Sequence, residues 1–325
     1  MLRGEPDGRR VPSSHAGRAL RLPLRTPACG GDDSAGLRYR PWPTERGARL
    51  ETVARTSENE GEEGGIPEAV NAAFWAKAHN VAAYSRRNLR SAEVAIMLSH
   101  HEAFSGRVLE VGCGAGRVTG YIQMAAAEAY GVDISAEMVE HCRRVYPGAT
   151  FIQADMLDVG ELDEAPFDVV FATFNVIDAL SPERRHLALE GFKQALKPGG
   201  LLAMSSHNRA FAPDVVGPVG EALTHLRSGD LRAVARTVPR LPRQVRNHRR
   251  MRRFEQEEHE YALLNDPAHD FLLLHYYATR EDQERQLADH GFEVLECLDL
   301  EGNLLADGEP AAHCSELHYV SRRSA

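Results

Sequence analysis

A short apolar strand that runs into three closely spaced glycines and then directly into a helix constrains the fold of this chain most. Residues 108–119 read VLEVGCGAGRVT, with Gly112, Gly114 and Gly116 at alternate positions. Glycines allow a tight turn and close approach of a ligand, and a helix N-terminus offers N–H groups to a negative group. The spacing is GxGxG, and Arg117 stands where the dinucleotide fingerprint has its third glycine, which argues against NAD and FAD. No Gly-Lys-Ser/Thr follows, so a nucleoside triphosphate loop is not indicated either.

Apolar strand-like segments alternate with helical ones on both sides of this loop. Strands are predicted over 107–112, 129–134, 150–154, 168–173 and 201–205, and helices over 91–100, 117–127, 136–145 and 182–196. A turn (KPGG) is predicted over 197–200, and the chain ends with helix 280–290 and strands 293–300 and 317–321. The last connection is short and has no clear helix, so these two strands are expected to be antiparallel. Such alternation is typical of an α/β protein with a mostly parallel sheet.

Composition and periodicity divide the chain into five segments. Residues 1–65 lack apolar periodicity and are expected to form a disordered N-terminal tail. The other segments are N-terminal helices over 66–106 (including 69–78), an α/β core over 107–207, a helical cap insertion over 208–270, and a C-terminal helix with two strands over 271–325. Helical runs at 219–226, 231–238 and 251–264, with Pro239 and Pro242 between the last two, suggest the cap.

Several broad classes are excluded by composition. Hydrophobic residues make up 43% of the 325 residues, enough for a sizeable core, and no apolar run reaches the roughly 18 residues of a membrane span. The N-terminus lacks a signal-peptide pattern. Five cysteines, an odd number without CxxC spacing, argue against both a disulfide framework and a zinc site. We therefore expect a soluble, cytoplasmic protein without membrane association, a monomer or homodimer.

Charge is distributed unevenly. The formal net charge is −9, yet residues 225–253 hold ten arginines and one acid, Asp230. The rest of the chain is acidic, which argues against a nucleic-acid partner. The arginines can be interpreted as a rim that attracts an anionic acceptor, or as a solvated face paired with nearby glutamates such as Glu255 and Glu257.

Acidic residues follow the next two predicted strands. Asp133 ends the second strand (AYGVDIS), where a carboxylate can accept hydrogen bonds from both hydroxyls of a ribose. Asp155 ends the third strand (QADM), placed to meet an adenine amino group, with Met156 against the ring. Either aspartate alone could be a solvated strand end. Together with the glycine loop, in this order, they predict a nucleoside ligand.

The sequence resembles the class I S-adenosylmethionine-dependent methyltransferases. The residues that carry the resemblance are VLEVGCGAGRVT (108–119), GVDIS (131–135), QADM (153–156), FDVVFATFNVIDAL (167–180), LKPGGLLAMSSHN (196–208) and REDQERQLADHGFEVLECLDL (280–300). The resemblance covers about residues 70–207 and 271–325. It implies a Rossmann-like, doubly wound sheet of seven strands in the order 3-2-1-4-5-7-6, with strand 7 antiparallel and the cap after strand 5.

The same resemblance implies a cofactor and its binding residues. The cofactor is S-adenosyl-L-methionine, with S-adenosyl-L-homocysteine as product. Glu110 and the three glycines would surround its methionine part, Asp133 would bind its ribose, and Asp155 and Met156 its adenine. Ile134 is also expected to contact the cofactor. Asn175 would lie beside the ligand, and Tyr84, with Arg90 nearby, would close the pocket from the N-terminal helices.

The acceptor chemistry is less constrained. The segment after the fourth strand lacks the Pro-Pro-aromatic motif of base amino methylation, and no Pro-Cys pair indicates a cytosine C5 nucleophile. A small molecule, sugar or natural-product acceptor remains, and the expected reaction is O-methylation with a histidine as general base. His207 and His275 are the candidate bases. His269, Tyr276, Tyr277 and Asp178 are candidates for contact with the acceptor.

Two alternatives stay open at this point. One is N-methylation of a small amine or peptide. The other is a non-catalytic protein of this fold that binds the cofactor in order to regulate or scaffold a partner. The retained ribose acceptor Asp133 favours an enzyme.

Overall fold

The computed structural model describes residues 70–71, 74–75, 88–211 and 217–324, which lie in one compact unit, Gly47–Ala325. The predicted tail 1–65 and Tyr84 lie outside the described residues, and of the predicted helix 69–78 the four described positions are helical. The helices are α4 Ser91–Ser99, α5 His101–Phe104, α6 Thr119–Ala125, α7 Ala136–Val145, α8 Pro182–Ala195, α9 Pro218–Ser228, α10 Leu231–Thr237, α11 Leu241–Met251 and α12 Arg280–Asp289. The strands are β1 Arg107–Val111, β2 Glu128–Asp133, β3 Thr150–Gln153, β4 Phe167–Ala172, β5 Leu196–Asn208, β6 Gln256–Glu257, β7 Ala262–Leu264, β8 His275–Ala278, β9 Phe292–Leu298 and β10 Glu316–Arg323.

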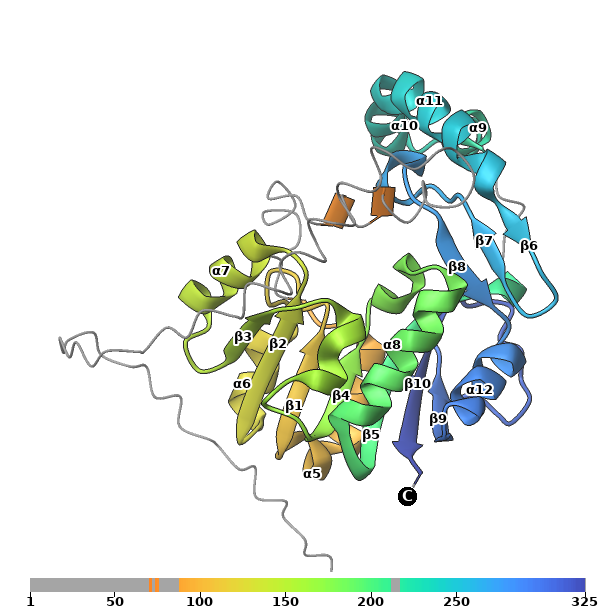
Figure 1. The fold of residues 1–325 in the computed structure, drawn as a ribbon. Coiled ribbons are helices and arrows are strands. Elements are labelled where there is room, and N and C mark those ends of the chain that lie inside the picture. The colour runs from red at the N-terminus through yellow and green to blue at the C-terminus, as the bar shows by residue number, and fades with distance from the viewer. Residues whose placement is uncertain (1–69, 72–73, 76–87, 212–216, 325) are drawn as a thin grey trace, which may run out of the picture. The chain divides into compact units, whose positions relative to one another are not determined.

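The main sheet has the strand order β3-β2-β1-β4-β5-β10-β9 (Figure 1). Strands β1 to β5 are parallel, and β10 runs antiparallel to both β5 and β9. With β9 and β10 as the sixth and seventh strands, this confirms the predicted order 3-2-1-4-5-7-6 and the antiparallel strand 7.

Local sequence explains most of these elements. Helix α7 begins after Ser135, whose hydroxyl accepts a hydrogen bond from the Met138 N–H, and helix α8 begins after Ser181 with Pro182 in its first turn. Side chains of α8 and α12 pack on one face of the sheet, as Phe192 and Leu287 do. Side chains of α4, α5 and α6 pack on the other face. The sheet is therefore covered on both faces, as expected for a doubly wound fold.

The segment after β5 differs from the prediction. Helices α9 and α10 form as expected, but the predicted helix 251–264 is wrong: α11 ends at Met251, and the chain then forms β6 and β7. β7 pairs with β6 and with β8 in antiparallel fashion, and β8 pairs in parallel with the end of β5 (His207↔Tyr277). One edge of β5 pairs with β10 at His207. β8 pairs with the opposite edge, which becomes free where the pairing of β5 with β4 ends at Ala172.

The added strands β6, β7 and β8 change the carboxyl edge of the sheet. They place residues of β8 directly beside His207, at the edge where sheets of parallel strands bind ligands. Among the described residues, no helix is long and apolar enough to cross a membrane.

Candidate active site

The glycine loop between β1 and α6 has an open side at one position. Gly112, Gly114 and Gly116 have φ values of +65°, +52° and +78°, which favour glycine. An added Cβ would lie 2.7 Å from the Val176 side chain at Gly112 and 2.3 Å from the Tyr146 ring at Gly116. At Gly114 it would meet no atom within 4 Å. Gly114 is thus the position at which a ligand can approach the backbone of the loop.

Asp133, at the end of β2, is tied to this loop. The Gly114 N–H donates to Asp133 Oδ2 (2.8 Å), and the Ser135 N–H donates to Oδ1 (2.9 Å). Burial raises the pKa of Asp133, against the effect of these two hydrogen bonds. The carboxylate is half-buried and retains lone pairs, so it can still accept hydrogen bonds from a neighbouring hydroxyl group.

The next strand ends in Asp155 and Met156. Asp155 accepts a hydrogen bond from the Leu157 N–H (3.1 Å) and forms an ion pair with Arg184 (2.7 Å). Met156 opens the short 3₁₀ helix η2, Met156–Glu161, and packs half-buried against the core. Ile134, directly after β2, is half-buried. These residues lie at successive strand ends, as the sequence predicted, while their contacts with a ligand remain expectations.

Glu110, one of the expected cofactor residues, is buried inside β1. Its Oε2 accepts a hydrogen bond from the Thr119 hydroxyl of α6. Burial raises the pKa of Glu110 to about 8, although the Thr119 hydrogen bond and the nearby Arg117 act in the opposite direction. A buried carboxyl with this pKa carries a proton over much of the neutral range.

His207 and Asp178 form a hydrogen-bonded pair at the end of β5. Asp178 Oδ2 lies 2.7 Å from His207 Nδ1 and also accepts a hydrogen bond from the His207 backbone N–H (2.7 Å). Asp178 is fully buried, and its pKa is lowered because Arg185 and His207 outweigh its burial. An ionised Asp178 requires the proton of a neutral His207 to reside on Nδ1, which leaves the lone pair on Nε2.

Asn175 supports the same assignment from the other side of the ring. Its Oδ1 accepts a hydrogen bond from the Ser205 hydroxyl (2.7 Å), so Nδ2 is the atom that lies 3.2 Å from His207 Nε2. An amide N–H facing Nε2 needs a lone pair there. Asn175 and its neighbour Phe174 both have φ values near +60°, a strained conformation for non-glycine residues. The end of β4 thus holds an amide group next to His207 at a conformational cost.

Arg185 explains why Asp178 stays in place. The Arg185 guanidinium is fully buried and donates to Asp178 Oδ1 (2.5 Å), and the Ser206 hydroxyl donates to the same oxygen (2.8 Å). Asp178 therefore has no exposed surface with which to contact an acceptor. The expectation that it lines the acceptor site does not fit this position, because it lies behind His207 and holds its ring.

A second histidine–aspartate pair adjoins the first. His275 Nδ1 lies 2.8 Å from Asp266 Oδ2, and the Tyr277 hydroxyl donates to the same oxygen (2.8 Å). Burial opposes protonation of His275, but Asp266 outweighs it and the pKa of His275 is raised. The centroid of the His207 ring lies 5.3 Å from that of His275 and 4.7 Å from that of Tyr277.

The remaining predicted acceptor residues separate into two groups. His269 lies 6.1 Å from His275 between ring centroids, against Phe74 and Trp75, and burial lowers its pKa to about 4. Tyr276 is buried on the opposite face of β8, with its ring 4.2 Å from the Arg185 guanidinium. Alternation along the strand accounts for this, since His275 and Tyr277 share one face and Tyr276 the other. Tyr276 is thus not brought beside His207.

Some residues of the site were not predicted. Glu316, at the start of β10, accepts a hydrogen bond from Asn175 Nδ2 (2.9 Å) and forms an ion pair with Arg90. Asp266 holds His275 and Tyr277. Asp266 opens the segment DPAHDFLLLHYY, whose cluster of histidines and tyrosines was the available signal. Glu316 has no local signal that links it to this site, because Asn175 and Arg90 are 141 and 226 residues away in the sequence.

Comparison with known proteins bears on the domain and the fold. Residues 108–200 match the family model of a methyltransferase domain. The chain is 30% identical over 141 residues to a malonyl-acyl-carrier-protein O-methyltransferase of Enterobacter lignolyticus, which covers 43% of this chain and 53% of that protein. It is 35% identical over 106 residues to a carboxy-S-adenosyl-L-methionine synthase of Photobacterium profundum, covering 30% and 43%. The chain thus spans about half the length of the curated relatives it matches.

A solved structure shows the same fold. It is the 1,6-didemethyltoxoflavin-N1-methyltransferase of Burkholderia thailandensis with bound 1,6-didemethyltoxoflavin and S-adenosylhomocysteine. The TM-score is 0.50 and the identity 15%, covering 82% of this chain and 94% of that one.

Proposed function

We propose that this chain, a class I S-adenosylmethionine-dependent methyltransferase by its matched domain and its sheet order, methylates an oxygen atom of a small molecule. The observation that carries the proposal is the Asp178–His207–Asn175 arrangement at the end of β5. Two separate hydrogen-bond arguments assign a lone pair to His207 Nε2. An imidazole held in this orientation, with its Nε2 lone pair at a ligand-binding edge, is suited to accept the proton of a hydroxyl group.

The residues that would hold the cofactor lie at the other half of the same edge. Gly114 has open space beside its backbone, and Asp133 presents a carboxylate next to it. These features fit a ribose and an attached chain that pass over the loop, with Asp155 and Met156 beyond for the adenine. Bound S-adenosylmethionine supplies an activated methyl group. The protein's part is to align the acceptor and to remove its proton.

Within this proposal Asp178 orients the His207 ring. Asn175 donates a hydrogen bond to His207 Nε2 until the hydroxyl group of the acceptor joins or replaces it there. The pair His275–Asp266 and Tyr277 line the side of the acceptor next to β8. His269 stays neutral near pH 7, because its pKa of about 4 is far below that pH. It can therefore contribute a hydrogen bond or a ring surface, but no charge.

The proposal is tested with the full chain, methyl-labelled S-adenosylmethionine and a panel of small molecules that carry hydroxyl, carboxyl or amino groups. We expect label on a hydroxyl oxygen, and His207→Gln should reduce the turnover number by about 10²- to 10⁴-fold. The matched control is His259→Gln, which changes an exposed histidine of the loop between β6 and β7. Label on nitrogen, or on a carboxylate with no effect of His207→Gln, would contradict the proposal, because a carboxylate needs no base.

A further inference from the structure

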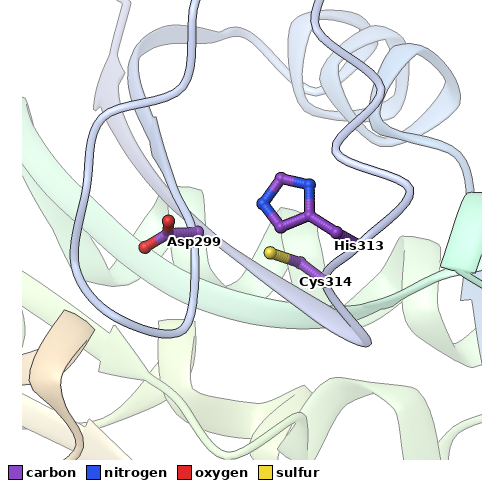
Figure 2. A group of neighbouring side chains, drawn as sticks. All are labelled: Asp299, His313 and Cys314. Carbon is purple, nitrogen blue, oxygen red and sulfur yellow. The ribbon is translucent and has the colours of Figure 1, made fainter.

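A cluster of three potential metal ligands lies in the loop between β9 and β10, outside the candidate active site. Asp299 directly follows β9, and His313 and Cys314 shortly precede β10. One ligand atom of each lies within 4.8 Å of the other two. Figure 2 shows the Cys314 sulfur and the His313 ring on the side of the loop that faces Asp299. Asp299 and Cys314 are buried, and His313 is exposed.

Asp299 is a buried carboxylate whose charge has no cation beside it. It is 6% exposed, and within the described part of the chain it forms no ion pair. Its oxygens accept hydrogen bonds from the Asn303 N–H (2.8 Å) and side-chain amide (2.9 Å). A carboxylate in this position, with no cationic side chain paired to it among the described residues, can take a bound cation as its partner.

The surroundings of the cluster are anionic. Residues 299–315 contain four acids and no lysine or arginine, in a chain that has 38 basic residues. Asp299, Glu301 and Glu309 place negative charge near the Cys314 sulfur. A divalent cation at the sulfur is attracted both by a thiolate and by these carboxylates.

We propose that Asp299, His313 and Cys314 bind a zinc ion. Carboxylate oxygen, imidazole nitrogen and thiolate sulfur are the three donor types that zinc takes in proteins, while magnesium and calcium do not bind thiolates. Zinc bonds of about 2.0–2.3 Å place tetrahedral ligand atoms roughly 3.3–3.7 Å apart. The ligand atoms lie within 4.8 Å of one another, so binding draws them together by up to about 1.5 Å. The thiol proton of Cys314 passes to solvent on binding, and a fourth position stays open to water.

The loop is held in place before any metal binds. The Asn208 side-chain amide donates to the carbonyl oxygens of Pro310 (3.2 Å), Ala311 (3.0 Å) and Cys314 (3.1 Å). Arg280 donates to the carbonyl oxygens of Ala306 (2.6 Å) and Glu309 (3.0 Å). The three ligands are thus positioned by the fold, and the ion would fasten the loop that leads into Glu316.

The test uses the full chain, freed of metal by a chelator and titrated with Zn²⁺ or Co²⁺. We expect one equivalent of Zn²⁺ to bind per chain. His313→Ala and Cys314→Ser should each weaken the affinity for Zn²⁺ at least about tenfold. The Co²⁺ complex should show near-ultraviolet sulfur-to-metal charge-transfer absorption that Cys314→Ser abolishes. His259→Ala and Cys297→Ser are the matched controls and should change neither result.

His313 is exposed, so its replacement leaves the packing of the loop intact and tests binding even if Cys314→Ser fails to fold. The proposal is overturned if the chain takes up no Zn²⁺. It is also overturned if His313→Ala and Cys314→Ser bind Zn²⁺ like the controls, since the ion would then lie at other residues among the 15 histidines of the chain.

Discussion

The two halves of the carboxyl edge are built in different ways. The proposed cofactor half consists of the glycine loop, Asp133 and the start of η2, and its parts lie within about fifty consecutive residues. The proposed acceptor half joins residues from three separate segments: Asn175 and Asp178 after β4, His207 in β5, and Asp266 and His275 in the segment from the end of β7 to the start of β8. The cofactor half therefore depends on backbone conformation, and the acceptor half depends on buried charge pairs.

The largest expected effect is a loss of stability when Asp178, in the acceptor half, is replaced. Asp178→Asn removes the only anion that contacts the fully buried Arg185 among the residues that the structure describes, and Arg185 keeps neutral partners such as Gln283 and Ser206. We expect the free energy of unfolding to fall by about 3–5 kcal/mol, measured by urea denaturation. Glu140→Gln breaks the exposed pair with Arg144 and should cost less than about 0.5 kcal/mol. Equal, small effects would mean that the buried pair does not hold this half together.

The next largest effect concerns pH and the cofactor half. Burial raises the pKa of Glu110 to about 8, so the folded chain keeps a proton that the unfolded chain, with a pKa of about 4.3, releases. The free energy of unfolding should therefore fall as the pH rises from about 4.3 to 8, by at most roughly 1.4 kcal/mol per pH unit from this group. Glu110→Gln should remove that slope in denaturation curves taken across this range.

Glu102→Gln is the matched control, because Glu102 is exposed on α5 and should leave the slope unchanged. A wild-type slope in Glu110→Gln would show that other groups cause the pH dependence.

A smaller effect separates backbone strain from ligand approach in the glycine loop. Gly114 and Gly199 both have positive φ and open space where a Cβ would be. Alanine at either position should cost about 1–2 kcal/mol of stability through strain. Only Gly114→Ala should also weaken the binding of S-adenosylhomocysteine, by at least about tenfold in titration calorimetry, because the added methyl group of the alanine would occupy the space of the ligand. Equal affinities of the two variants would contradict the assignment of the open side to the cofactor.

The smallest expected effect concerns the arginines of α11. Of the arginines in residues 225–253, only Arg240 and Arg243 form ion pairs among the described residues, and both pair with Asp270. The structure therefore does not contain the expected pairing with Glu255 and Glu257. If the acceptor is anionic, kcat/KM should fall as ionic strength rises, because the Debye length shrinks from about 30 Å at 0.01 M to about 10 Å at 0.1 M. Replacing Arg246, Arg249 and Arg250 by Gln should flatten that dependence. Insensitivity of the native chain to salt would indicate a neutral acceptor.

The comparison also explains what could be predicted from sequence. Helix α7 was predicted with its observed ends, since Ser135 caps it and its apolar side chains recur at helical spacing. Asp133 and Gly114 could be predicted as cofactor residues because strand ends and glycines are local signals. The predicted helix over 251–264 failed because pairing of Ala262–Leu264 with β8 overrides the helical preference of the glutamates before it. Predicted turn 197–200 lies inside β5, where the pairing with β4 is irregular.

The acceptor half was found only in part for the same reason. His207 was predicted because it follows the fifth strand, and His275 because it lies just before the last helix, but which acid holds each histidine depends on contacts across the fold. Asp178 lies 29 residues from His207 and was expected to meet the acceptor. Glu316 was missed entirely. Pairings of this kind leave no periodic pattern in a single sequence.

The central claim is that the two halves are separable, and calorimetric titration of S-adenosylhomocysteine into Asp133→Ala and His207→Gln tests it most directly. Asp133→Ala removes a hydrogen-bond acceptor of the cofactor half and should weaken binding by about 1–3 kcal/mol, roughly 5- to 150-fold. His207→Gln should bind the ligand within about twofold of the native chain while losing methyl transfer. Comparable loss of affinity in both variants, or native affinity in Asp133→Ala, would contradict the account.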